Sequence, residues 1–119
     1  MTEAERGNRL PAQRHGLIVN VVPELRKEYL RLHSAVWPEV EATLTACNIT
    51  NYTIFLLDDT LFAYYEYVGS DHDADMARIA GDPVTQEWWT HTDPCQTVFG
   101  TSGGAAQGWR EAREVWHLP

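Results

Sequence analysis

The order of apolar and helix-capping patterns along this chain predicts an α+β fold of the ferredoxin-like type, with its elements in the order βαββαβ. Three observations lead to this prediction. A β-branched segment comes directly before an amphipathic helical segment, two further strand-like segments are joined by a short polar turn, and a second helical region precedes a final strand-like segment. With right-handed crossovers, this order gives one antiparallel sheet whose helices lie on one face.

The first part of the chain contains one strand and a helical region interrupted by a proline. "HGLIVNVV" (15–22) is short, apolar and β-branched, which is typical of a strand. Pro23 cannot continue a hydrogen-bonded ladder but suits the first turn of a helix. Apolar side chains recur at helical spacing in residues 24–36. We expect Pro38 to end this helix and to begin a second helical segment over 38–48.

A hairpin follows, and its composition predicts a second copy of the chain. "ITNYTIFLL" (49–57) and "LFAYYEYV" (61–68) are rich in β-branched and aromatic residues and flank the turn "DDT". Two helices on one face cannot cover every large side chain that the hairpin carries. We therefore expect a homodimer in which a second copy covers part of this set: Tyr52, Ile54, Tyr65 and Tyr67.

Capping residues place the remaining helices. Ser70 before "DHDADMARIAG" is a suitable N-cap, and aspartates crowd the first turn of a helix over 71–81. The pair Asp82-Pro83 begins the next helix, which should stop before Pro94. Residues 111–119, "EAREVWHLP", are expected to form the last strand.

Length, charge and cysteine content limit the function classes. The chain has 119 residues and a formal net charge of -8, so we expect one domain over 14–119 and neither nucleic acid nor a membrane as partner. The polar residues 1–13 are expected to be a disordered tail, and the glycine-rich residues 99–108 a loop. Two cysteines without motif spacing indicate the cytoplasm, and no residue pattern indicates a metal site or another cofactor.

Five aromatic or titratable positions are candidates for a functional site. Tyr29 and His33 are four residues apart and so share one helical face, where a partly buried histidine can give or take a proton. Spacing alone favours a packing role for His33. The side chains of Trp88 and Trp89 point about 100° apart, so one is expected in the core and the other beside a pocket. Tyr52 could donate its hydroxyl to a ligand or pair with a tyrosine across the hairpin.

Several motifs together resemble the L-rhamnose mutarotase family. "EYLRLHSAVWPEVEATL" is similar to the helix "EY…RH…IWPE" of that family, and "NYTIFL" is similar to its strand "NY-I-L". "EWWTHTD" resembles its helix with two tryptophans, and "EVWHLP" resembles its closing "EVF-LP". The matches occur in the same order from about residue 16 to the C-terminus, which makes the set specific.

The resemblance implies a cofactor-free aldose 1-epimerase, an isomerase with a fold of the dimeric α/β-barrel type. Its substrate would be a small neutral monosaccharide, namely L-rhamnose or a related L- or 6-deoxy-sugar. His33 matches the family's proton donor, which as an imidazolium would protonate the ring oxygen. The residues that match its sugar contacts are Tyr29, Tyr52, Trp88 and Trp89.

Two other functions fit the same architecture. A monooxygenase or haem-degrading enzyme of the dimeric α/β-barrel type would also combine a buried histidine or tryptophan with this fold. A non-catalytic dimer would bind the sugar without accelerating the exchange of its anomers.

Overall fold

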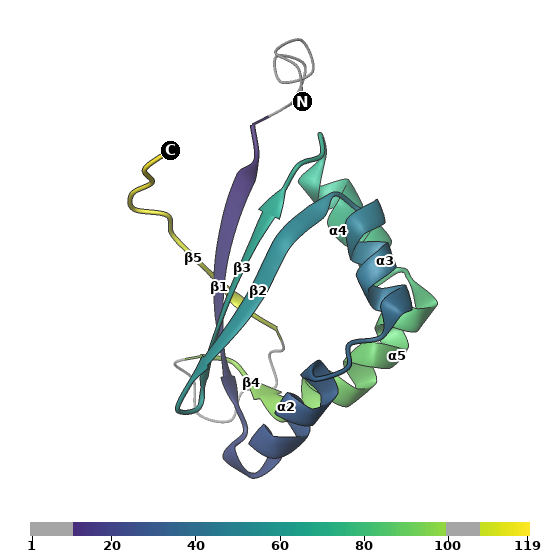
Figure 1. Ribbon diagram of the computed structural model, residues 1–119, viewed down its shortest axis with the longest axis vertical. Coiled ribbons are helices and arrows are strands. Elements are labelled where there is room, and N and C mark those ends of the chain that lie inside the picture. The colour runs from purple at the N-terminus through teal and green to yellow at the C-terminus, as the bar shows by residue number, and fades with distance from the viewer. Residues whose placement is uncertain (1–10, 100–107) are drawn as a thin grey trace.

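A single layer of helices covers one face of an antiparallel sheet in the computed structural model, which describes residues 11–99 and 108–119 (Figure 1). Most of the tail expected over 1–13 and of the loop expected over 99–108 lies outside these residues. The strands are β1 (Gln13–Val21), β2 (Ile49–Leu57), β3 (Thr60–Tyr67), β4 (Gln96–Thr97) and β5 (Arg110–Ala112). The helices are α2 (Arg26–His33), α3 (Pro38–Ala46), α4 (His72–Ala80) and α5 (Pro83–Thr92), with 3-10 turns η1 (Pro23–Leu25) and η2 (Asp93–Cys95).

The sheet has the strand order β2-β3-β1-β4, as the βαββαβ pattern predicted. β5 also pairs with β1, so two short strands share one edge of β1. The prediction of a last strand over 111–119 is wrong in extent, because only β5 pairs and residues 113–119 have no regular structure. Aromatic and β-branched residues favour a strand locally, but a strand also needs a hydrogen-bonded neighbour, and the chain leaves β1 after Ala112.

Proline and aspartate set the helix ends. α2 ends at His33, four residues before Trp37, which is extended with ψ 130° because a proline follows it. Pro38 then begins α3, as predicted. The predicted cap of α4 is wrong by one residue, because the side chain of Asp71, rather than that of Ser70, accepts a hydrogen bond from the amide of Ala74.

Two of the hairpin tyrosines that were expected to need a second copy of the chain lie beneath the helices. Tyr65 and Tyr67 are 8% and 0% exposed and pack under the helices. The helix layer covers more of the sheet than expected. Each helical region is broken into two helices, and both of these helices pack against the sheet. The expectation that Tyr65 and Tyr67 need a second copy to cover them is therefore wrong, whereas Tyr52 remains 42% exposed. The opposite face has an exposed apolar set of its own: Phe55, Leu57 and Phe62.

A hydrogen-bonded polar network joins the end of β3 to α4 and to the residue that follows the C-cap of α3. The buried hydroxyl of Tyr67 donates to the carboxylate of Asp75, which also accepts from the side chains of Asn48 and Arg78. These bonds, the one from Tyr67 most strongly, lower the pKa of Asp75. We call these four residues the Tyr67 network. Its buried polar atoms are paired, which is what a stable core requires.

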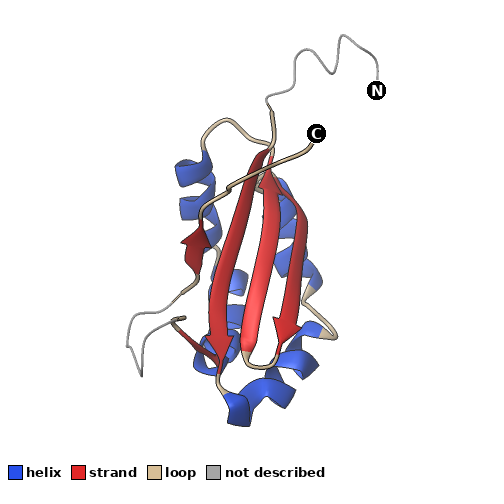
Figure 2. Ribbon diagram, turned by 90° about the vertical axis from the view of Figure 1, so that its left-hand side faces the viewer, coloured by secondary structure: helices blue, strands red, loops and turns tan. Residues whose placement is uncertain are grey.

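The C-terminal segment passes over the uncovered face of the sheet. Figure 2 shows residues 113–119 crossing the side of the strands that is opposite to the helices. Glu114 is anchored to β1 through an ion pair with Arg14, with 2.6 Å between Oε1 and Nε. Beyond that contact the large side chains are exposed: Val115 (86%), Trp116 (76%) and Leu118 (71%). Among the described residues, no helix is long and apolar enough to cross a membrane.

Candidate active site

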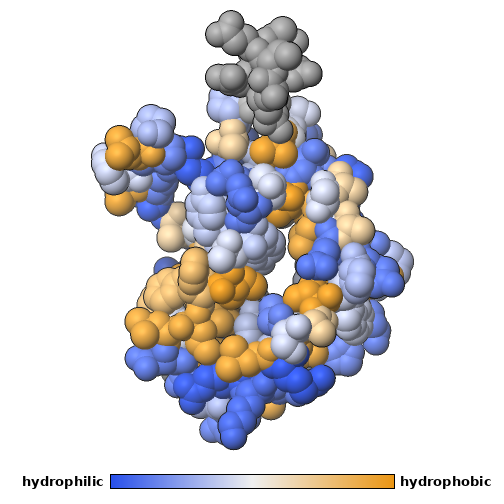
Figure 3. Space-filling model, in the orientation of Figure 1, coloured by the Kyte–Doolittle hydropathy of each residue, from blue (hydrophilic) through white to orange (hydrophobic). Residues whose placement is uncertain are grey.

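A cavity of about 390 Å³ opens between the sheet and helices α2 and α5, and its size is typical of a site for a small molecule. In the space-filling view the molecule is hollowed between the two layers, and hydrophobic residues gather around the opening (Figure 3). All five residues singled out from the sequence line this cavity. The full lining is Tyr29, His33, Tyr52, Ile54, Trp88, Trp89, Thr92, Asp93, Gln96, Gly108 and Trp109.

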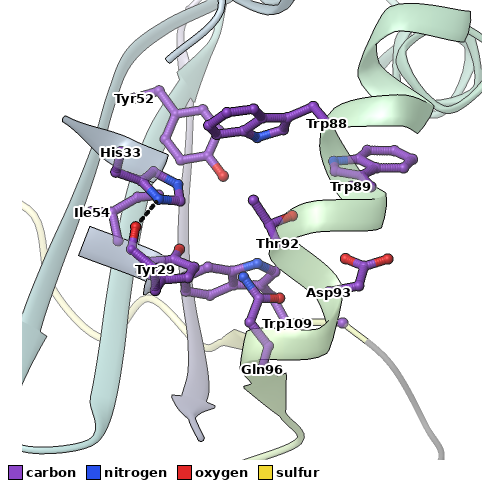
Figure 4. A pocket seen from close by; sticks show the side chains of 11 residues that line it. Tyr29, His33, Tyr52, Ile54, Trp88, Trp89, Thr92, Asp93, Gln96 and Trp109 are labelled. Atoms are coloured by element: carbon purple, nitrogen blue, oxygen red, sulfur yellow. Dashed lines mark hydrogen bonds between the residues drawn. The ribbon is translucent and has the colours of Figure 1, made fainter. Parts of the chain in front are cut away.

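His33 is the last residue of α2, and its ring is fixed by three contacts. Nδ1 lies 2.9 Å from the carbonyl oxygen of Tyr29, one helical turn earlier (Figure 4). The imidazole stacks on the Tyr29 ring with 4.2 Å between centroids, and the edge of Trp88 lies against it at 5.5 Å. Because a carbonyl oxygen only accepts, Nδ1 carries the hydrogen. In the neutral ring, Nε2 is therefore the unprotonated nitrogen.

Burial sets the protonation states of the three ionisable groups around this point. It lowers the pKa of His33 below its ordinary value, although the bond to the Tyr29 carbonyl acts in the opposite direction. Burial likewise raises the pKa of the Tyr29 and Tyr52 hydroxyls. The imidazole is thus available as a proton acceptor, and both tyrosines remain hydrogen-bond donors at neutral pH.

A β-bulge directs Tyr52 into the cavity. The register between β2 and β3 shifts between Thr50 and Thr53, and Asn51 has a left-handed φ of 51°. One extra residue reverses the alternation of side chains. Tyr52 therefore shares the helix-facing side of β2 with Ile54, and its hydroxyl points into the pocket while the residue as a whole is 42% exposed (Figure 4).

The adjacent tryptophans of α5 leave the helix in different directions, as predicted from helical geometry (Figure 4). Trp88 is 6% exposed and packs edge-on against Trp37 as well as His33. Trp89 is half-buried, and its ring packs against both core clusters. Trp88 is the core residue of the pair, yet both residues line the cavity.

Four side chains of the lining were not singled out from the sequence: Thr92, Asp93, Gln96 and Trp109. Thr92 and Asp93 lie one helical turn after Trp88 and Trp89, so helical spacing could have indicated both, whereas Gln96 belongs to β4. Trp109 follows the glycine-rich segment and reaches the pocket because β5 pairs with β1. Sequence spacing contains no signal for that contact.

The cavity has few charged groups. Asp93 supplies the one carboxylate among the described residues of its lining, and burial raises the pKa of this carboxyl. Within residues 11–99 and 108–119, no group of three histidine, cysteine or acidic side chains could hold a metal ion. The cavity therefore presents aromatic faces, neutral hydroxyls and one imidazole nitrogen, which suits a neutral, hydroxyl-rich ligand.

Comparison with known proteins identifies the family. The sequence model described as L-rhamnose mutarotase matches residues 14–118. The chain belongs to the L-rhamnose mutarotase family. The L-rhamnose mutarotase of Listeria monocytogenes serotype 4b is 37% identical over 108 residues, which cover 89% of this chain and 98% of that protein. The L-rhamnose mutarotase of Oceanobacillus iheyensis is 31% identical over the same shares of the two chains. The motif resemblance is thus confirmed.

Solved structures confirm the fold class. The L-rhamnose mutarotase of Formosa agariphila superposes with a TM-score of 0.68 at 19% identity, over 90% of this chain and 99% of that one. Tetracenomycin F2 cyclase of Streptomyces glaucescens, a polyketide cyclase, superposes with a TM-score of 0.60 at 13% identity over the same shares. Because these two proteins share the fold but differ in their reactions, the architecture alone does not determine the chemistry of the mutarotase family.

Proposed function

We propose that this protein interconverts the α and β anomers of L-rhamnose by acid–base catalysis at His33. The observation that supports this most directly is the position of the imidazole. Its Nδ1 is held by the Tyr29 carbonyl, which leaves Nε2 as a base within a cavity lined by aromatic rings and hydroxyls. Membership of the L-rhamnose mutarotase family supports the same reaction and substrate.

The lowered pKa of His33 sets the order of proton transfers in this proposal. Neutral Nε2 takes the proton from the anomeric hydroxyl, and the imidazolium so formed donates it to the ring oxygen as the C1–O5 bond breaks. Rotation about C1–C2 in the open-chain aldehyde presents the other face of the carbonyl. The same transfers in reverse close the ring and restore the neutral imidazole, so atoms and charges balance over the cycle.

Other aromatic residues of the cavity lining would hold the sugar. The hydroxyls of Tyr29 and Tyr52 stay protonated and can donate to sugar oxygens. The rings of Trp88, Trp89 and Trp109 offer apolar faces to the C–H groups and the methyl group of a 6-deoxy-sugar. A pocket of this composition binds a neutral monosaccharide and orients its anomeric centre toward His33.

Saturation-transfer NMR of the anomeric protons tests the proposal. The wild-type protein should accelerate anomer exchange of L-rhamnose, and His33→Asn should fold normally and lose about 100- to 10,000-fold of that acceleration. A His33→Asn variant with full activity would refute the assigned role. Binding without any exchange would indicate a sugar-binding dimer instead, and a Soret shift on haem titration would favour the haem-degrading alternative.

A homodimer is the expected assembly. The uncovered sheet face exposes Phe55 (60%) and Leu57 (65%), and the segment 113–119, with its exposed Trp116, runs over that same side (Figure 2). A second copy related by a two-fold axis would cover both surfaces at once. Light scattering after gel filtration should give a dimer for the wild type and a monomer for Phe55→Asp/Leu57→Asp. A monomeric wild type would contradict the proposal.

The cytoplasm is the expected compartment. Cys47 and Cys95 are both buried and unpaired, which suits a reducing environment. Fractionation of the source cells with an antibody against the protein should find it with cytoplasmic enzymes. Recovery from an oxidising compartment would contradict this expectation.

A further inference from the structure

Asp93 lies at the C-terminal end of α5, an unfavourable position for a carboxylate. It is the C-cap of α5, where the negative end of the helix dipole disfavours a carboxylate. Asp82, at the other end of the same helix, shows the usual role of an aspartate: its carboxylate accepts from the amide and hydroxyl of Thr85. The carboxylate of Asp93 makes no hydrogen bond or ion pair with any described residue. Asp93 is exposed, so its carboxylate is accessible to a ligand.

Asp93 borders the cavity, where a ligand could reach its carboxylate. Asp93 follows Trp89 by one helical turn and lines the pocket from α5, whereas His33 lies on the other side of the cavity (Figure 4). Pro94 follows directly, and the amide of Asp93 donates to the carbonyl of Trp89, so the backbone that carries the carboxylate is fixed. An unpaired acceptor on a fixed backbone is suited to hold a ligand donor.

We propose that Asp93 binds the hydroxyls at C3 and C4 of the sugar and so determines which sugars the site accepts, an inference that rests on the proposed reaction at His33. In a pyranose ring the C3–C4 bond lies opposite the C1–O5 bond. A sugar whose anomeric centre meets His33 therefore turns its C3 and C4 hydroxyls toward the opposite wall. A carboxylate has two oxygens and accepts only, so it matches two adjacent hydroxyl donors.

This role predicts a change in affinity without a change in chemistry. Asp93 is remote from the atoms that exchange protons, and its bonds to the sugar persist through ring opening. Interactions that are equal in the ground state and the transition state affect KM and leave kcat unchanged. Asp93→Asn should raise KM for L-rhamnose by about 10- to 100-fold, as expected for the loss of charge-assisted hydrogen bonds, and leave kcat near the wild-type value.

Monodeoxy sugars make the test specific. For the full-length protein, exchange rates at increasing sugar concentration are measured with 2-, 3- and 4-deoxy-L-rhamnose. The KM penalty of Asp93→Asn should persist with the 2-deoxy sugar and become small with the 3- or 4-deoxy sugar, because the contacted donor is then already absent. Asp93→Ser gives an independent variant, and Glu87→Gln, on the same helix but outside the cavity lining, is the matched control.

Three outcomes would overturn the inference: an unchanged KM in both Asp93 variants, an equal penalty with every deoxy sugar, or a fall in kcat at constant KM, which would indicate proton transfer. Its failure is distinguishable from failure of the proposed function. If the wild type exchanges anomers and His33→Asn does not, the reaction stands whatever Asp93 does. If the wild type shows no exchange, NMR titration of L-rhamnose still measures the contribution of Asp93 to binding.

Discussion

Two regions between the same sheet and the same helix layer contain similar side chains in different states. The Tyr67 network joins a tyrosine, an aspartate and their partners by hydrogen bonds and is closed to solvent at Tyr67. Next to it, His72 pairs with the hydroxyl of Tyr65 at 2.7 Å. The cavity also contains tyrosines, a histidine and an aspartate, but Nε2 of His33 and the carboxylate of Asp93 have no partner among the described residues.

The difference shows that residue type does not separate a structural group from a functional one. A buried polar group with its partners contributes to stability, whereas an unpaired one is costly unless a ligand satisfies it. Nε2 of His33 and the carboxylate of Asp93 both border the cavity, whereas the hydrogen-bonded Tyr67 network lies outside its lining. The following predictions test that separation.

The largest expected difference is between the two histidines. His33→Asn should remove most of the anomer exchange, about 100- to 10,000-fold, because it removes the base. His72→Asn should leave the exchange near the wild-type rate, because its ring pairs with Tyr65 outside the cavity lining. Both variants are compared by saturation-transfer NMR, with near-UV circular dichroism as the folding control. Equal loss in both would show that the two regions act as one site.

Substitution of Tyr67 should affect stability, whereas substitution of Tyr52 should affect sugar binding. Tyr67→Phe removes the buried donor of the three that the carboxylate of Asp75 accepts from, and should lower Tm by about 5 °C or more. Tyr52→Phe should leave Tm unchanged and lower kcat/KM by about 10-fold, because it removes one hydroxyl from the cavity. Calorimetry and NMR exchange on both variants give the comparison. A large fall in Tm for Tyr52→Phe would place it with the structural group.

As the pH falls, enzymatic activity should be lost before the Tyr67 network loses its contribution to stability. The pKa of His33 is lowered from an ordinary value of 6.5, so the neutral base is lost, and activity falls, only as the pH drops below that value. The pKa of Asp75 is lowered from 3.8. Its contribution to stability is therefore complete above that value and is lost as the pH falls through the lower folded pKa.

Between these two ranges the protein should be folded but progressively less active. Exchange rates corrected for buffer catalysis, measured beside far-UV circular dichroism from neutral to acid pH, would show the separation. Coincident loss of both signals would mean that unfolding, rather than protonation of His33, ends activity.

Much of this arrangement could be predicted from local patterns. Pro38, Asp82 and the apolar spacing of α2 act within one or two helical turns. Their effects on the backbone could therefore be predicted from the local sequence. The motifs around Tyr29 and His33, Tyr52, and the two tryptophans also indicated five residues that line one cavity. The prediction failed where a partner distant in sequence decides the outcome: the extent of the last strand, the face on which Tyr65 and Tyr67 lie, and the presence of Trp109 and Asp93 in the lining.

The sequence by itself determined the element order, the helix breaks and the family of this chain, because proline, capping residues and periodicity act on their own neighbourhood. Only the tertiary structure decided the chemistry available at each polar group. The Tyr29 carbonyl fixes the hydrogen on Nδ1 of His33, a bulge at Asn51 turns Tyr52 inward, and pairing of β5 with β1 brings Trp109 to the pocket. Each effect depends on which atoms meet after folding, and that determines which polar groups remain free to bind a sugar.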